Sequence, residues 1–175
     1  MPAHIFGDPG ALQFEVGPTD PDSYSMRCVE VRALDLHVTA DDNTVYVPNF
    51  LLHLERALTS FRSGTRFEQR ADVFEGLGPE DIHRIFTDAS NEFPGKSKLS
   101  SQWRFLEFGD ISLHTMSFLI PTQGRLYLTL GMSLYEEDRK EFRCAEVSAE
   151  ALSQAMSATF ELVATEYERD KSSRS

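Results

Sequence analysis

The residue types that carry most enzyme chemistry are few in this sequence and lie far apart along it. The chain contains no glycine-rich phosphate-binding loop, no G-x-S-x-G nucleophile elbow, no H-E-x-x-H helix and no C-x-x-C pair. These signatures account for many common hydrolases, nucleotide-binding enzymes and metalloenzymes. The sequence therefore predicts a non-enzymatic protein without a cofactor. Its histidines are scattered at His4, His37, His53, His83 and His114.

Two local arrangements could still support metal binding or catalysis. Glu80 and His83 have the i, i+3 spacing of carboxylate-bridged metal helices, but that architecture needs a second such motif and two further helical carboxylates. His114 shares its parity with Met116 and Phe118 in a predicted strand. That position favours a hydrogen-bonded histidine at the edge of the core over a catalytic one. We predict no metal site and no catalytic residue.

The two cysteines, Cys28 and Cys144, lie in strand-like runs and have no metal-type spacing. The pattern favours two buried free thiols in a reducing compartment over a disulfide. Nothing beside Cys144 identifies a group that would lower the pKa of its thiol, so a nucleophilic role is not predicted.

Charge is the strongest remaining signal. Acidic residues outnumber lysine and arginine by 28 to 17, which gives a formal net charge of −11. Such a surface repels phosphate backbones and anionic membranes, so nucleic-acid and membrane partners are disfavoured. A basic protein would be attracted to it. The competing interpretation is that the charge only keeps the domain soluble.

The acidic residues concentrate in two regions that we expect to contact a partner. Residues 66–92 contain seven acids against three arginines, and Phe67, Phe74 and Leu77 could act as apolar anchors beside them. The second acidic region is the loop after a long alternating strand, and the polar and aromatic outer row of that strand is a further candidate surface. The alternative is that both are solvated segments without a partner. The predicted partner-binding residues are Asp72, Glu75, Glu80, Asp81, Tyr127, Tyr135, Glu136, Glu137 and Asp138.

These residues must be positioned by a predicted antiparallel meander over residues 103–147. In residues 125–135, with sequence RLYLTLGMSLY, every second residue is leucine or methionine. This alternation places one row of side chains on a core and the other towards solvent or a partner. Further strands of the meander are predicted at residues 103–108, 111–120 and 142–147, and residues 136–141 form a loop.

The N-terminal half is predicted to add strands and covering helices. A strand near residues 12–16 precedes a long strand over residues 26–39, in which a β-bulge near Arg32 and Ala33 would reconcile a change of apolar parity. A turn at residues 40–43 leads into a strand at residues 45–47. Amphipathic helices are predicted from Asn49 to the Ser63-Gly64 stop, from Pro79, and over residues 149–168, with a loop at residues 94–98.

This order of elements predicts an α+β fold: an antiparallel meander sheet with helices packed on one face, in a two-layer single domain. We expect the domain to cover residues 1–170 and residues 171–175 to form a flexible C-terminal tail. The opposite face of the sheet would then be polar or a binding surface. No apolar run approaches the ~20 residues that span a bilayer, and the N-terminus lacks a signal-peptide pattern. We therefore expect a cytoplasmic protein.

In its order of elements the chain resembles the small acidic immunity proteins of bacterial polymorphic-toxin and contact-killing systems. The resemblance is carried by residues 103–111 (WRFLEFGDI), by the two long strands and C-terminal helix that follow, and by the hairpin and helix of residues 41–61. It covers most of the chain and includes no diagnostic motif, so it assigns no functional residue. The resemblance implies stoichiometric blocking of a cognate toxin that acts in the cytosol.

Three hypotheses for the function follow. The leading one is a non-enzymatic acidic module that binds a basic protein partner such as a toxin. The second is a small-ligand-binding or enzymatic α+β domain with a cavity near Trp103, His114 and Tyr127. The third is a secretion chaperone or adaptor that uses an exposed apolar face.

Overall fold

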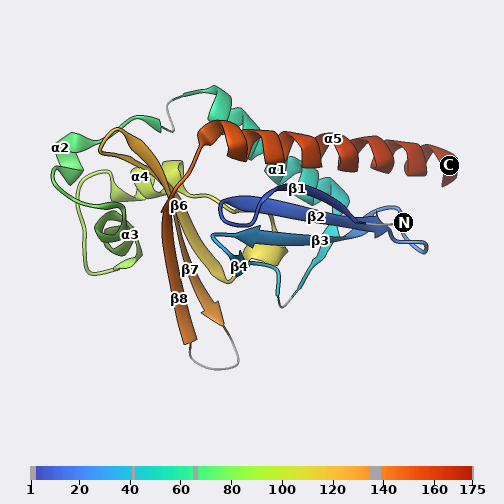
Figure 1. Ribbon diagram of the computed structural model, residues 1–175, viewed down its shortest axis with the longest axis horizontal. Coiled ribbons are helices and arrows are strands. Elements are labelled where there is room, and N and C mark those ends of the chain that lie inside the picture. The colour runs from blue at the N-terminus through green and yellow to red at the C-terminus, as the bar shows by residue number, and fades with distance from the viewer. Residues whose placement is uncertain (1–2, 41, 65–66, 135–138, 175) are drawn as a thin grey trace.

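The computed structural model describes residues 3–40, 42–64, 67–134 and 139–174, and it confirms the α+β class with antiparallel sheets (Figure 1). The first sheet contains β1 (His4–Asp8), β2 (Leu12–Thr19), β3 (Met26–Ala33), β4 (Leu36–His37) and β5 (Thr44–Tyr46). The second sheet contains β6 (Thr115–Thr122), β7 (Arg125–Leu134) and β8 (Arg139–Glu146). The helices are α1 (Val47–Arg62), α2 (Ala71–Phe74), α3 (Pro79–Thr87), α4 (Lys96–Trp103) and α5 (Ala149–Arg174).

The first sheet contains one strand that the sequence did not reveal. β1 pairs with β2 along its whole length, yet four of its five residues are exposed and Phe6 is only half-buried. No apolar alternation therefore marks β1 in the sequence. In β2 and β3 the alternation is clear, and the paired residues Phe14 and Val31 are both fully buried.

The change of parity in the predicted long strand arises from a chain reversal and not from a β-bulge. Leu34 and Asp35 have φ angles of 49° and 63°, and they connect β3 to the antiparallel β4. Positive φ at both central residues is the turn geometry that matches the twist of paired strands. The strand predicted at residues 45–47 corresponds to β5, which pairs with the beginning of β3, but Val47 already belongs to α1.

Two long helices cover the first sheet. α1 begins at Val47 rather than at Asn49, because Pro48 fits the first turn, where its missing N–H would be unpaired in any case. α5 contacts α1, β1 and β2 and continues past Glu168 to Arg174, so residues 171–174 are helical. In Figure 1, α5 lies along the first sheet.

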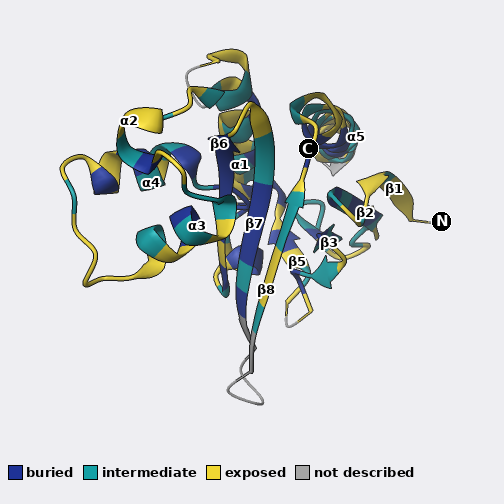
Figure 2. Ribbon diagram, turned by 60° about the vertical axis from the view of Figure 1, so that its left-hand side comes forward, coloured by how far each residue is buried: buried dark blue, intermediate teal, exposed yellow. Residues whose placement is uncertain are grey.

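β6 and the central residues of β7 are buried on both faces of the second sheet, whereas the described side chains of β8 are exposed or half-buried (Figure 2). Leu128, Leu130 and Met132 belong to the main core, which also contains the buried residues of the first sheet, α1 and α5. Phe118 and Ile120 belong to a second apolar cluster, built with residues of α3 and α4. Helices therefore lie on both sides of this sheet. The prediction that helices cover only one face was incomplete, because α3 and α4 cover the other face. The side-chain row of β7 that includes Thr129 is covered by α3, and Thr129 is fully buried.

The strand predicted over residues 103–108 is instead the end of α4 followed by extended chain. α4 begins at Lys96, within the predicted loop at residues 94–98. In the described part of the chain, this segment pairs with β6 only through an isolated bridge from Arg104 to Phe118. Leu106 and Gly109 have φ angles of 58° and 87°, which break the extended geometry of a ladder. β6 consequently begins at Thr115 and not at residue 111.

A buried ion pair joins α5 to the first sheet. Arg27 of β3 is 3% exposed, and its guanidinium lies 2.6 Å from a carboxylate oxygen of Glu166, which is 13% exposed. The Nε of Arg27 also donates a hydrogen bond of 2.8 Å to the carbonyl of Gly17. The pair therefore fixes the C-terminal half of α5 against β2 and β3.

Removing the carboxylate of this pair should destabilise the fold strongly. We expect Glu166→Ala to lower the free energy of unfolding by about 3 kcal/mol, because it leaves the buried charge of Arg27 uncompensated. Glu168→Ala is the matched control, since Glu168 is 68% exposed where it pairs with Lys171, and it should cost at most about 1 kcal/mol. Urea unfolding of both variants measures the difference. Equal losses of unfolding free energy would show that the buried pair stabilises the fold no more than the exposed pair does.

Candidate functional site

Half of the predicted acidic residues of α2 and α3 are paired locally. Asp72 accepts two hydrogen bonds from Arg70, at 2.8 and 2.6 Å, and this contact lowers the pKa of the Asp72 carboxyl. Asp81 lies 3.1 Å from Arg84 on the same helix. Glu75 and Glu80 are exposed and form no ion pair with any residue that the structure describes. Of the four predicted carboxylates of this region, these two have no ion pair among the described residues.

The second predicted group is only partly described. Tyr127 is half-buried on β7, where it pairs in register with Glu146 of β8, and Glu146 accepts a hydrogen bond of 2.9 Å from Arg125. The predicted residues Tyr135, Glu136, Glu137 and Asp138 lie outside the described residues.

The clearest surface feature is an apolar notch where α3 stops covering the second sheet. Gly131 of β7 pairs with Met116 on β6 and with Phe142 on β8, so a glycine lies between two large apolar side chains in one cross-strand row. The notch belongs to a cleft of about 610 Å³. We call it the α3 cleft, and it is lined by His83, Thr87, Leu113, His114, Thr115, Met116, Gly131, Met132, Glu141 and Phe142.

His83 forms the polar part of the α3 cleft. It is 7% exposed, and its Nδ1 lies 2.9 Å from the hydroxyl of Thr129. Its ring makes edge contacts with Phe118 and Phe142, with centroids 5.3 and 4.9 Å away. Burial lowers the pKa of His83 to about 4, because the apolar surroundings disfavour the charged imidazolium. His83 is therefore neutral at physiological pH.

Gly131 and His83 are the residues of this site that sequence reasoning missed. A Cβ at position 131 would lie 3.3 Å from the Nε2 of His83, so the glycine permits the close approach of the ring. A glycine inside a strand often marks such an approach, and this was the available signal in the alternating run of residues 125–135. The packing of His83 on Thr129 requires tertiary structure and had no signal in the sequence.

The structure also places the two cysteines and the potential metal ligands of the described residues. Burial, with a smaller effect of Glu80, raises the pKa of the Cys144 thiol to about 11, which keeps it protonated. Both cysteines are free, but Cys28 is exposed and Cys144 only half-buried, so the prediction that they are buried was wrong. Within the described ranges, no three histidine, cysteine, aspartate or glutamate residues could together hold a metal ion.

The cavity predicted near Trp103, His114 and Tyr127 corresponds only in part to the α3 cleft. His114 lines this cleft, just before β6 begins. Trp103 is fully buried in the second apolar cluster, and Tyr127 is not among the lining residues.

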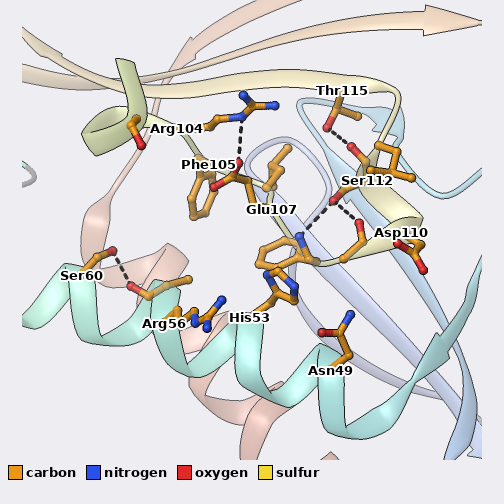
Figure 3. A pocket seen from close by; sticks show the side chains of 16 residues that line it. Asn49, His53, Arg56, Ser60, Arg104, Phe105, Glu107, Asp110, Ser112 and Thr115 are labelled. Atoms are coloured by element: carbon orange, nitrogen blue, oxygen red, sulfur yellow. Dashed lines mark hydrogen bonds and ion pairs between the residues drawn. The ribbon is translucent and has the colours of Figure 1, made fainter. Parts of the chain in front are cut away.

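A second, polar cleft of about 520 Å³ lies between α1 and residues 104–115 (Figure 3). Asn49, His53 and Arg56 project into it from successive turns of α1. On the opposite wall, Arg104 and Glu107 form an ion pair of 2.9 Å. Asp110 also lines the cleft, so its two arginines face two carboxylates. This balance gives the polar cleft hydrogen-bonding capacity without a net charge.

Comparison with protein-family models, with curated proteins and with solved structures finds no match to this chain. In the part of the chain that the structure describes, every helix is too short or too polar to cross a membrane.

The buried His83 should make stability depend on pH in a defined window. Its pKa is about 4 in the folded protein against an ordinary value of 6.5, so between these values the unfolded chain binds the proton more strongly. We expect this contribution to be complete above pH 6.5 and to be lost as the pH falls towards 4, by about 3 kcal/mol in total.

Urea unfolding of the wild type and of His83→Gln between pH 7 and 4 measures this contribution. The amide of glutamine keeps hydrogen-bonding groups at the position but does not titrate, so the variant should lose less stability on acidification. Parallel pH profiles for the two proteins would contradict the assignment.

Proposed function

We propose that the protein binds a basic protein partner through the face that α3 shares with the end of the second sheet. The observation that carries this proposal is the clustering of exposed apolar side chains. Six large apolar side chains are exposed in the described part of the chain, and three of them, Leu113, Met116 and Phe142, line the α3 cleft. Exposed apolar residues that gather around one concave site are typical of an interaction surface.

The charge distribution supports a basic partner. The net charge of −11 attracts cationic proteins over long range. Glu80 adds an uncompensated carboxylate on α3 itself, and Glu75 adds one before α3, beside Pro121 and Gln123 at the other end of the second sheet. In this arrangement the carboxylates accelerate encounter, whereas the apolar side chains of the cleft supply most of the affinity.

A more specific version of this proposal is that the protein is an immunity protein, as its resemblance in element order implies. The partner would then be a toxin with a basic surface, blocked stoichiometrically by a preformed face. Co-expression in bacterial cells tests this form: the protein should restore growth to cells that produce the toxin encoded beside its gene. A partner that is not toxic would be consistent with the binding proposal but would exclude the immunity role.

Charge reversal on the predicted face tests the binding proposal. A tagged copy of the protein captures partners from a lysate of the source organism, and the purified partner is then measured by surface plasmon resonance. We expect Glu75→Lys with Glu80→Lys to slow association about tenfold at low salt, with a small effect on dissociation.

The matched control is Glu55→Lys with Glu161→Lys, which makes the same change in net charge on exposed positions of α1 and α5. A partner that associates equally slowly with both double variants responds only to net charge, and the proposed face would then be wrong. Binding that does not depend on salt would also contradict the proposal.

A second candidate function is small-ligand binding in the polar cleft, favoured by the convergence of Asn49, His53 and Arg56 on one cavity (Figure 3). A thermal-shift screen of carboxylic acids, with Arg56→Ala as the comparison, tests it. A compound that raises the melting temperature of the wild type but not of the variant would support this function.

A further inference from the structure

β8, the outer strand of the second sheet, presents an open edge. It follows β6 and β7 in the strand order and pairs with β7 in an unbroken register over residues 139–146. Among the residues that the structure describes, no strand pairs with its other side. Figure 1 shows that the far ends of β7 and β8 extend beyond the first sheet. Such an edge carries a row of backbone groups with which a further strand could pair.

The free edge exposes the backbone groups of alternate residues. The N–H of Val147 donates a hydrogen bond of 2.9 Å to the carbonyl of Leu126, its neighbour on the β7 side. Because these bonds recur at every second residue of an antiparallel pair, the odd-numbered residues of β8 bond to β7. Phe142 and Cys144 therefore direct their N–H and C=O groups outwards. The carbonyl of Phe142 accepts a hydrogen bond of 3.0 Å from the side chain of Arg143, which agrees with this direction.

Most of the devices that protect a sheet edge are missing from residues 139–146. Proteins usually prevent pairing at an edge with a short strand, a proline, a bulge or charged side chains. β8 is eight residues long, contains no proline and shows no shift of register. β1, the outer strand of the first sheet, is shorter and contains Gly7 at a φ angle of 89°. Only the charges of β8 could prevent pairing, so their order decides the outcome.

The charges of β8 are complementary to those of a second β8. A two-fold axis perpendicular to the sheet joins two such edges in antiparallel order, and each residue then faces one whose side chain lies on the same side. With Phe142 opposite Phe142 of the second copy, Glu141 faces Arg143 and Arg143 faces Glu141. The same alignment brings outward backbone groups opposite one another. Moving the axis by one residue would place Arg143 on Arg143 or Glu141 on Glu141, and like charges directly opposite are destabilising.

We infer that the protein forms a two-fold symmetric dimer, in which the β8 strands of two copies pair around Phe142 and join the two three-stranded sheets into one. Within one copy Arg143 already lies 3.4 Å from Glu141, and their side chains are 51% and 23% exposed. The dimer places two such pairs side by side, so that each arginine lies between two carboxylates. This inference does not rest on the proposed function, since it concerns this chain alone.

The apolar row of the second sheet supports the same register. Met116, Gly131 and Phe142 lie opposite one another, and Phe142 ends the row at the open edge, where it is 38% exposed. In the dimer the two Phe142 side chains meet on the α3 side of the sheet, and aromatic cross-strand pairs stabilise paired strands. Because the axis is perpendicular to the sheet, both α3 clefts lie on the same side of the dimer.

The net charge of −11 opposes association but acts weakly at this edge. Residues 139–146 contain three basic residues and two glutamates, so the edge itself is not acidic. At physiological ionic strength, charges separated by more than about 8 Å are largely screened, whereas the charges that meet across the edge lie closer. The contact area of one pair of strands is small, so we expect a weak dimer with a dissociation constant of about 50 µM.

Sedimentation equilibrium measures the dimer and tests its register by charge exchange. We expect Glu141→Arg and Arg143→Glu each to weaken dimerisation at least about tenfold, because like charges then face one another. An equimolar mixture of the two variants should form a heterodimer, and a chain with both substitutions should dimerise as the wild type does. A wild type that stays monomeric at about 1 mM, or single variants that dimerise unchanged, would overturn the inference.

Glu55→Arg is the matched control, since it makes the same change of net charge as Glu141→Arg at an exposed position of α1. It should not weaken the dimer. Equal weakening by both substitutions would show that dimerisation responds to something other than the β8 edge, and the inference would then be wrong.

Amide hydrogen exchange of the wild type, followed by NMR, tests the pairing without any variant. The N–H groups of Phe142 and Cys144 should become protected as the protein concentration rises through the dissociation constant. The N–H of Ala145 faces β7 and should be protected at every concentration. Concentration-dependent protection in β1 in place of β8 would locate the dimer at the other sheet and overturn the inference.

Discussion

β6 and the central residues of β7 are buried on both faces of the second sheet, and much of the molecule is arranged to provide this cover. A three-stranded sheet with two apolar faces needs cover on each side. The first sheet, α1 and α5 enclose one face, and α3 and α4 enclose the other. The residues of β6 from Ser117 to Thr122 are consequently all buried, in contrast to the alternating burial of β2.

The same constraint explains which parts of the fold could be predicted from the sequence. The strand at β7, the apolar stripe of α1 and the Gly-Pro start of α3 are local patterns, and each is confirmed. The open outer face that the alternation in β7 predicted is wrong at Thr129, which is buried. The segment after α4 was misleading because its apolar residues serve two different cores. Trp103 packs in the second cluster, whereas Phe105, Leu106 and Phe108 pack in the main core. Their spacing imitates a strand, although the chain is passing between the two cores.

The candidate site was harder to predict because it arises from register and helix placement together. The acidic residues of α2 and α3 are visible in the sequence, but the local pairing of Asp72 with Arg70 and of Asp81 with Arg84 is not. The notch depends on three strands aligning Met116, Gly131 and Phe142 in one row. Its polar group comes from a helix far away in the sequence, where His83 contacts Thr129. Charge patterning thus indicated a region, whereas the specific contacts required the tertiary structure.

The ion pair between Arg27 and Glu166 also sets the order in which the chain can complete its fold. Arg27 emerges from the ribosome early, and its counter-ion lies in the last helix to be made. β1 depends on the same helix, because Gly7 lies directly against Ala155. The side of the N-terminal sheet that α5 covers therefore lacks this cover until α5 has been synthesised. Until then its exposed apolar residues and strand edges depend on not being captured by other chains.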